Sequence, residues 1–587
     1  MSRPSRPGRR AVALVALLLL AVLLPASALA REASDQRYMI VMKGAYALDG
    51  SYALGSGYAL GAVEALGPEY ALGPAYALIK SYALAGDYAL YALDEAEALG
   101  LDYALYALYA LDDAYALAGD YALGGSYALG DLPAYYALDE NYALAREYAL
   151  RLVEAAGGEL TSDLSAQLGV MVVDSKNATF AQAMSGYALV ETVGGDFGWK
   201  AFPTMQEALA SGALTVVEGS GVSAAGEPLS DQQWSMRLIR ADQAHAVTTG
   251  SPKVAVGILD TGIDGAHADF VQAGSGSNVD CGRGADFTAQ GPGVGIPAAC
   301  VDNNFHGTHV AGIVAARLNG LGVMGVAPDV TVVPIKVCDA DGHCYASDVV
   351  EGITYAGDLA LDVINMSFFV DDDAFQQSTE AKCTDDPQQR AFRQATERAI
   401  QYVRRQGGTP VAALGNSDRD LANKPEGNNC AVVPAEAPGV VGTMSLGPES
   451  GKAWFSSYGT GSVDVGAPGG DWDELRDGPA GACARQVVST LPGNAYGCFQ
   501  GTSMASPHTT GVAALIVSRY GKTNKSGELR MSPTAVQSHL QETAIDVGLS
   551  GYDECFGNGR IDALRAVNGQ TSRLHDASAP HCPEYDE

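Results

Sequence analysis

Three short segments of the chain each hold one residue type that nucleophilic catalysis by a serine requires. They follow in the order aspartate, histidine, serine, with Asp260 in segment 258–264, His306 in segment 306–312 and Ser503 in segment 501–508. A serine hydroxyl is a weak nucleophile at neutral pH, so an imidazole must accept its proton and a carboxylate must orient that imidazole. The three segments therefore predict a triad that acts on acyl groups.

A fourth segment offers a hydrogen-bond donor for the oxyanion that such a reaction creates. The apolar, strand-like run 410–414 is followed by Gly415 and Asn416, whose side-chain amide can serve this purpose. The alternative is that Asn416 only terminates a strand.

These four segments resemble those of the subtilisin-like serine peptidases, the subtilases, in the Asp, His, Ser order known for that family. The resemblance covers roughly residues 234–567. Residues 363–367 are similar to the family's substrate-lining strand, and residues 455–459 and 463–469 are similar to the strands that precede the serine segment.

Other interpretations of the same motifs are weaker. Aspartic peptidases also carry Asp-Thr-Gly, but no second copy follows here. His306 and His309 have a spacing that suits metal ligands on a helix, yet no glutamate follows His306 as in zinc peptidases. We expect His309 to pack at the start of the helix.

The segments between the motifs predict an α/β fold with a mostly parallel sheet flanked by helices. Residues 253–259, 330–337, 363–366 and 410–414 are continuous apolar runs, and residues 346–356 and 390–406 favour helices between them. Such alternation implies a sheet covered on both faces, with the site at the carboxyl ends of its strands.

The stretch 505–520 after Ser503 predicts a buried helix that tolerates Pro507 in its first turn. The free N–H groups at that helix end favour a nucleophile there, and the Ser503 N–H is expected to join the Asn416 amide around the oxyanion.

The family resemblance implies that substrate pairs with two backbone edges of the cleft, which suits a broad-specificity peptidase. The expected contacts are Gly342, His343 and Cys344 on one edge, Ser367, Phe368 and Phe369 on the other, and Ala412, Ala413, Leu414 and Val432 in an apolar main pocket. The family usually has a small residue and a glycine at the positions of Phe368 and Phe369, which leaves the pocket shape open. Asp339, Asp341 and the acidic run 371–373 favour either basic residues in outer subsites or a solvated loop.

The resemblance also implies a structural calcium site, with no cofactor for catalysis itself. Its expected ligands are the side chains of Asp269 and Asn319 and the carbonyl oxygens of Arg317, Leu321 and Val323. The glutamine ligand that the family places near the mature N-terminus has no clear counterpart in the sequence.

The N-terminus indicates export. Two arginines precede the apolar stretch 11–24, and small residues at 28–30 fit a signal-peptide cleavage site, with no stop-transfer segment after it. Export by the general secretory route from a bacterium, without a stable membrane anchor, is the interpretation that we favour over the twin-arginine route. The net charge of −32 argues against nucleic acid as a partner.

All 10 cysteines lie between Cys281 and Cys582, and their even number in an exported chain predicts disulfides rather than a zinc site. Sequence alone leaves the connectivity open. Neighbour spacing suggests Cys281 with Cys300, Cys338 with Cys344 and Cys483 with Cys498, which leaves Cys383 with Cys430 and Cys555 with Cys582.

A tripeptide repeat, Tyr-Ala-Leu, dominates residues 46–150. We interpret it as a poorly ordered low-complexity insertion, although a stack of short strands is an alternative. The flanking segments 37–43, 158–173, 180–184 and 189–193 favour strands and a helix, and together they resemble a small α+β subtilase propeptide interrupted after its first strand. Residues 198–227 exceed the usual propeptide and have no assigned role.

The expected organisation is therefore a signal peptide over 1–30, a propeptide over 31–225 and a subtilisin-like peptidase domain over 226–587. The expected protein is a monomeric secreted serine endopeptidase that cleaves protein or peptide substrates through an acyl-enzyme on Ser503. It would be made as a self-processing zymogen, with its own propeptide as inhibitor. The alternative is an inactive subtilase scaffold that acts as a surface or binding protein.

Overall fold

The structure is a computed structural model of the whole chain. It describes residues 36–43, 146–187, 189–218, 226–288, 293–294, 297–370, 383, 385–424, 428–478, 482–524, 527–579 and 582. The expected signal peptide, the acidic run 371–373 and nearly all of the Tyr-Ala-Leu repeat lie outside these residues.

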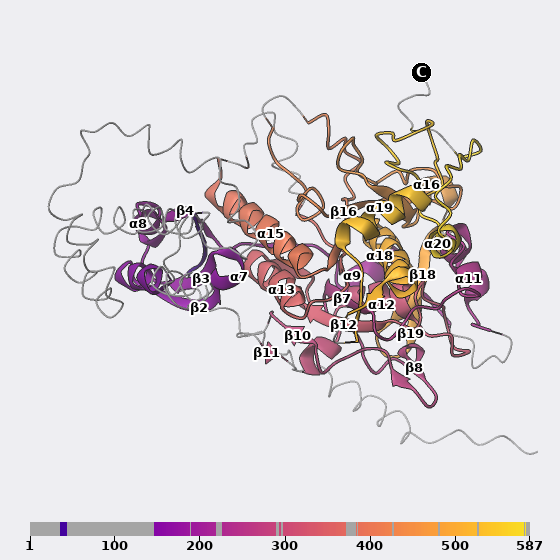
Figure 1. Cartoon of the computed structure of the whole chain (residues 1–587), viewed down its shortest axis with the longest axis horizontal. Helices are drawn as coiled ribbons and strands as arrows, with labels where there is room; N and C mark the ends of the chain where they lie inside the picture. The colour runs from indigo at the N-terminus through magenta and orange to yellow at the C-terminus, as the bar shows by residue number, and fades with distance from the viewer. Residues whose placement is uncertain are drawn as a thin grey trace, which may run out of the picture.

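An eight-stranded sheet forms the centre of the larger domain (Figure 1). Seven strands are parallel, and only the edge strand β11 is antiparallel to its neighbour. In spatial order the strands are β11 (Gly293–Val294), β10 (Ala285–Asp286), β12 (Thr331–Lys336), β7 (Ala255–Asp260), β14 (Val363–Met366), β15 (Thr409–Ala413), β16 (Val441–Leu446) and β17 (Val465–Pro468). The parallel α/β sheet expected from the sequence is confirmed.

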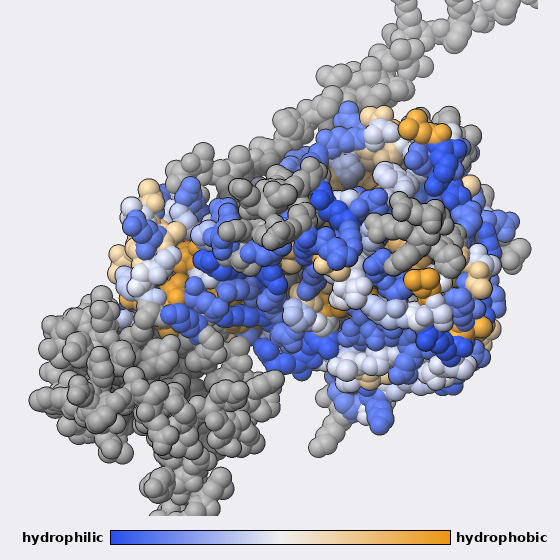
Figure 2. Space-filling view, turned by 90° about the horizontal axis from the view of Figure 1, so that it is seen from above, coloured by the Kyte–Doolittle hydropathy of each residue, from blue (hydrophilic) through white to orange (hydrophobic). Residues whose placement is uncertain are grey.

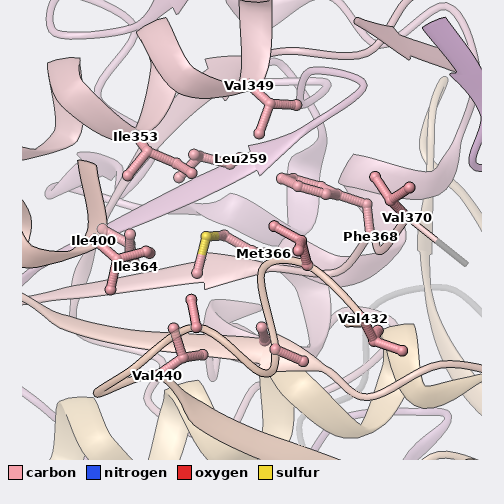
Figure 3. Close-up of a cluster of buried hydrophobic side chains, with 14 of the residues drawn as sticks. Leu259, Val349, Ile353, Ile364, Met366, Phe368, Val370, Ile400, Val432 and Val440 are labelled. Carbon is pink, nitrogen blue, oxygen red and sulfur yellow. The ribbon is translucent and has the colours of Figure 1, made fainter. Parts of the chain in front are cut away.

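Helices cover both faces of this sheet, which explains why its strands are continuous apolar runs rather than alternating ones. Helices α13 (Ala346–Asp358) and α15 (Pro387–Arg405) pack on one face, where Leu259 and Ile364 meet Val349, Ile353 and Ile400 (Figure 3). Helices α12 (His306–Ala315) and α18 (Thr502–Tyr520) pack on the other face. Adjacent residues of β7 thus enter two different cores.

Helix α15 shows how local sequence sets these bounds. The Asp386 side chain accepts hydrogen bonds from the backbone N–H groups of Gln388 and Gln389, and Pro387 occupies the first turn, where it removes no helical hydrogen bond. Two arginines in the last turn complement the partial negative charge at the C-terminal end.

A smaller domain precedes the larger domain and consists of a four-stranded antiparallel sheet in the order β2-β3-β1-β4. Its strands are β1 (Gln36–Met42), β2 (Gly158–Leu164), β3 (Val170–Ser175) and β4 (Val190–Gly195), and its helices are α7 (Ser165–Leu168), α8 (Phe180–Ser185) and one over residues 146–155. That last helix includes the final five residues of the expected repeat, so the end of the repeat is helical and not a poorly ordered segment.

The small domain is two-sided because side chains alternate along its strands. In β1, Ile40 and Met42 face the domain's own core around Phe180, whereas Met39 and Val41 face the core shared with α15. Figure 1 shows this domain to one side of α13 and α15.

Residues 198–217, which we call the strap, run from the small domain across the larger domain. The strap contains β5 (Gly198–Lys200), α9 (Met205–Ala210) and β6 (Thr215–Val217). Strand β5 pairs with β13 (His343–Tyr345), and β6 extends the hairpin of β18 (Val487–Leu491) and β19 (Ala495–Phe499). No role for this segment could be predicted from the sequence.

The ten cysteines form five disulfides, and none is free. Cys281–Cys300, Cys338–Cys344 and Cys483–Cys498 are the pairs that neighbour spacing suggested, and Cys383–Cys430 and Cys555–Cys582 are the two that remained.

Hydrophilic residues cover much of the face of the larger domain seen in Figure 2, in keeping with the large net charge. In the part of the chain that the structure describes, no helix combines the length and the hydropathy needed to cross a membrane.

One expected strand is absent. Residues 455–459 form a loop that makes only an isolated bridge between Tyr458 and Asp420. The loop is held by one side-chain and one backbone hydrogen bond: the Ser456 hydroxyl accepts from the Ser445 N–H, and the Ser457 N–H donates to the Gly415 carbonyl. The strand expected just after it is present as β17.

Candidate active site

Asp260 and His306 form a hydrogen-bonded pair at the carboxyl end of the central strand. Asp260 is the last residue of β7 and His306 is the first residue of α12. The imidazole Nδ1 lies 2.9 and 3.0 Å from the two Asp260 carboxylate oxygens, and both side chains are buried. A carboxylate in this position fixes which ring nitrogen carries the proton and leaves Nε2 as the proton acceptor.

Ser503 lies in the first turn of α18, directly after the backbone turn at Gly501 and Thr502. Its hydroxyl donates to the Ser367 carbonyl at 2.8 Å, and the His306 Nε2 has no hydrogen-bond partner among the described residues. The aspartate–histidine half of the triad is therefore assembled, whereas the serine hydroxyl points to the substrate edge.

Asn416 follows β15, beside the N-terminus of α18. Its Oδ1 accepts hydrogen bonds from the N–H and the hydroxyl of Thr502, each at 2.9 Å, which leaves the amide nitrogen as a donor. A side chain at Gly501 would lie 3.3 Å from that nitrogen, and Gly501 has a positive φ of 151°. Glycine at this position therefore gives the amide close access to the turn before Ser503.

The strap occupies the cleft beside the triad. The ring of Phe202 is stacked on the His306 imidazole with centroids 3.7 Å apart, and the Phe202 side chain is buried. The N–H groups of Ala201 and Phe202 both donate to the Gly342 carbonyl, at 2.9 and 3.2 Å. The Asn304 amide donates to the Pro203 carbonyl at 3.1 Å.

The first expected substrate edge is thus already paired with the chain itself. Residues 343 and 344 are opposite Lys200 and Trp199 in the antiparallel register. Gly342 has a φ of +82°, and a Cβ there would lie 2.1 Å from the Phe202 carbonyl oxygen, so glycine is required for this approach. The Cys338–Cys344 disulfide closes the turn that carries this edge.

The second edge contacts Ser503 through Ser367, whose hydroxyl donates to the Ser503 carbonyl at 2.8 Å and accepts from the Asn365 amide. Phe368 turns its side chain into the core toward Leu259 and Val349, so only its backbone faces a peptide (Figure 3). Phe369 is half-buried against the same core.

The expected main-pocket residues are all inside the protein. Ala412, Ala413, Leu414 and Val432 have no exposed surface, and the Val370 N–H donates to the Val433 carbonyl at 2.9 Å beside them. These side chains leave little depth for a large substrate side chain.

The histidines nearest the triad are neutral. Burial lowers the pKa of His309 to about 3 and that of His508 to about 4. His309 packs in the first turn of α12, as expected, and its Nε2 lies 3.2 Å from the Gly497 carbonyl. Neither ring is positioned to take a proton from Ser503 at neutral pH.

Two of the expected calcium ligands, Asp269 and Asn319, lie in neighbouring segments, although the described residues hold no group of three or more histidines, cysteines or acidic residues that could bind a metal ion. The Asp269 carboxylate accepts from the Val323 N–H at 3.0 Å through one oxygen, and its other oxygen is buried with no partner among the described residues. Asn319 lies in the same loop and donates to the Ala268 and Val271 carbonyls. No described residue donates a hydrogen bond to the carbonyls of Arg317, Leu321 or Val323.

The structure adds Glu227, which sequence reasoning missed. Its Oε1 accepts from the Gly320 N–H at 3.2 Å, and its Oε2 is buried without a partner among the described residues. Burial, and then the nearby Glu227 charge, raise the pKa of Asp269 to about 8. No spacing rule links Glu227 to the 317–323 loop, because it comes from a separate segment. Two close carboxylates with unpartnered oxygens suit a hard cation such as calcium.

A parallel sheet with an aspartate–histidine pair at its carboxyl end, a serine at a helix N-terminus and an asparagine amide beside it defines a serine peptidase of the α/β class. The model of the Subtilase family (Peptidase S8) matches residues 251–559. The chain belongs to the subtilase family.

Individual relatives agree with this assignment. Subtilisin DY of Bacillus licheniformis is 34% identical over 334 residues, which are 57% of this chain and 98% of the relative. The thermophilic serine proteinase of Bacillus sp. (strain AK1) is 32% identical over 57% of this chain and 67% of the relative. Among solved structures, the epidermin leader peptide processing serine protease of Staphylococcus aureus shares the fold. Its TM-score is 0.56 at 20% identity, covering 73% of this chain and 97% of that one.

Proposed function

We propose that this protein is a secreted serine endopeptidase, made as a zymogen, that hydrolyses peptide bonds through an acyl-enzyme on Ser503. The Asp260–His306 pair beside Ser503 is the observation that carries the proposal. The Ser503 oxygen would attack the peptide carbonyl while His306 Nε2 takes its proton, and His306 would then return that proton to the leaving amine. Water would release the acyl group in the reverse sequence.

Two donors would stabilise the oxyanion. The Asn416 amide nitrogen and the Ser503 backbone N–H both lie at the start of α18, where the helix leaves N–H groups unpaired. For attack, the Ser503 hydroxyl must leave the Ser367 carbonyl and turn to His306.

The zymogen proposal depends on the strap. While Phe202 covers the imidazole and β5 occupies the substrate edge, a peptide cannot use either. Phe202 is followed by Pro203, and we do not place the maturation cut at the bond between them. We therefore place the maturation cut after the strap, between Val217 and Glu227, so that Glu227 remains with the peptidase domain.

Substrates are proposed to be extended polypeptides with small or apolar residues before the cleaved bond. The edge at 342–344 binds β5 through backbone atoms, which recognises any extended chain. The fully buried Val432 and its neighbours argue against a deep pocket.

A structural calcium ion fits the site around Asp269. The side chains of Asp269, Asn319 and Glu227 and the carbonyls of Arg317, Leu321 and Val323 would hold it. Such an ion would neutralise the two buried carboxylates and fix the segment that starts the peptidase domain. The proposed calcium site is separate from Asp260 and His306, which handle the proton in the reaction.

A fluorophosphonate probe tests the proposal directly. It should label the mature secreted protein on Ser503, and Ser503→Ala should abolish labelling, peptide hydrolysis and self-processing while the fold is retained. Equal hydrolysis by Ser503→Ala and the wild type would refute the assignment.

A further inference from the structure

Asp302 is a second carboxylate in the interior of the active-site region. It lies in the loop before α12, only 6% exposed. Its Oδ1 accepts from the Thr261 hydroxyl and from the N–H groups of Asn304 and Phe305, each at 3.0 Å. Its Oδ2 accepts from the N–H and the hydroxyl of Thr308, at 2.9 and 2.7 Å. Every oxygen of this side chain is therefore engaged.

These bonds tie together the two residues that must meet in the triad. Thr261 follows Asp260 and donates its N–H to the Asp260 carboxylate at 2.8 Å. The Thr261 hydroxyl donates to Asp302 and also accepts from the Gly307 N–H at 3.0 Å. One hydroxyl thus links the end of β7 to the residue after His306, and Asp302 orients that hydroxyl.

Asp302 also shapes the backbone that delivers the imidazole. Phe305 has a φ of +145°, which is unfavourable for a residue with a side chain. The Asn304 and Phe305 N–H groups are both fixed by Asp302 on the approach to this residue. His306 can then begin α12 with its ring toward Asp260.

The charge of Asp302 is compatible with its position. Burial raises its pKa, but three backbone N–H groups and two hydroxyls converge on the carboxylate and favour the ionised form. The other charged or titratable groups facing this centre are Asp260 of β7, Asp264 after it, Lys336 of β12, His309 of α12 and His508 of α18. Because both of these histidines are neutral, the charged groups facing this centre are Asp260, Asp264, Asp302 and Lys336.

We propose that Asp302 is a positioning residue for the reaction of Ser503: it sets the geometry of the Asp260–His306 pair and stabilises the positive charge that His306 acquires. This inference rests on the proposed peptidase function. It extends the site by a residue that contacts neither substrate nor the reacting atoms.

The test compares Asp302→Asn with the wild type in the full secreted chain, using a fluorogenic peptide over a range of pH. The substitution keeps the size but removes the charge, and its amide hydrogens face the Thr308 donors. We expect kcat/KM to fall about tenfold or more at pH 7, mainly in kcat. The acid limb of the pH profile should move to lower pH, because the substitution removes a negative charge that favours the protonated catalytic base.

Asp362→Asn is the matched control. Asp362 is also a buried carboxylate, but it accepts from the Ala255 N–H at the opposite end of β7 and pairs with Arg530. Its substitution should leave the acid limb unchanged. A shift of the same size in both variants would show a general effect of lost charge and overturn the proposal.

Thr261→Val provides an independent test if Asp302→Asn does not accumulate. It removes only the hydroxyl between Asp302 and Gly307, so kcat should fall several-fold with little change in KM, and Thr261→Ser should restore it. Wild-type kcat in Thr261→Val, or an unmoved acid limb in folded Asp302→Asn, would overturn the proposal. If the wild type itself hydrolyses no peptide, the peptidase function fails instead.

Discussion

Phe202 lies face to face with His306, with 3.7 Å between the ring centroids and 22° between the ring planes. The same residue is tied by its backbone N–H to Gly342, at the substrate edge. A side chain of the chain's own N-terminal part therefore covers the imidazole that must accept the Ser503 proton. A substrate can therefore reach the catalytic base His306 only when the strap is released.

Phe202→Ala should accordingly unmask the site before maturation. Loss of a buried ring weakens the strap by about 1.5 to 3 kcal/mol, so the uncut chain should react with a fluorophosphonate about tenfold faster or more. The measurement is the labelling rate of the full-length band on a gel. Val216→Ala, at a strap position 51% exposed, should behave like the wild type. An unchanged labelling rate in Phe202→Ala would contradict the proposed role of the ring.

Arg398→Met should weaken the hold of the small domain on the peptidase domain. The Arg398 guanidinium donates to the Met42 and Leu168 carbonyls at 2.8 and 3.0 Å and pairs with Glu191 at 2.7 Å. Charge-assisted bonds at a half-buried interface are worth about 1.5 to 3 kcal/mol, so the cut small domain should dissociate at least tenfold faster. Size-exclusion chromatography after processing measures this.

Arg393→Met is the control for that measurement. Arg393 lies on the same helix, but its ion pair is with Glu397 of that helix. Equal dissociation rates for the two variants would show that Arg398 does not anchor the small domain.

Asn416→Ala should separate catalysis from binding. Its amide is expected to contact the oxyanion and not the ground-state peptide, so kcat should fall about a hundredfold or more with KM nearly unchanged, as in the subtilisin precedent. Steady-state kinetics on a peptide library gives both constants. Normal turnover in this variant would remove Asn416 from the proposed site.

Calcium should stabilise the protein through the Asp269 site. Chelation is expected to shorten the half-life at elevated temperature and to speed autolysis, because the buried Asp269 and Glu227 carboxyl groups then lose the cation that would compensate their burial. Calorimetric titration of calcium into the Ser503→Ala chain gives a readout free of autolysis. Glu227→Gln should weaken that binding, whereas Asp280→Asn, in a surface ion pair with Arg283, should not. Equal half-lives with and without chelator would count against the site.

Local patterns predicted most of the sheet and its helices. Strand β14 spans the predicted residues 363–366, and α13 extends the predicted helix 346–356 by two residues. The strands of this sheet are buried on both faces, so each can be recognised in the sequence as a continuous run of apolar residues. The triad segments were equally visible, because each has its own local motif.

Long-range pairing explains what the sequence did not reveal. Strand β6 of the strap is three residues long and is stabilised by its pairing with β19, far along the chain. Glu227 reaches the calcium ligands from a separate segment, and Asp302 acts through bonds to Thr261 and Thr308. Phe368 was expected to contact substrate, but its side chain is buried in the core with Leu259 and Val349.

Deletion of the Tyr-Ala-Leu repeat should leave catalysis intact. The small domain is closed on both sides of it: the Met42 and Lys43 N–H groups pair with the Gly169 and Leu189 carbonyls, and a helix starts at residue 146. Removing residues 46–144 preserves both features and every residue of the proposed site. We expect a secreted, self-processed protein with unchanged kcat per fluorophosphonate-titrated site, although the yield can fall if the repeat assists export. N-terminal sequencing decides the matter, since a mature N-terminus before the repeat, with activity lost on deletion, would favour a binding scaffold.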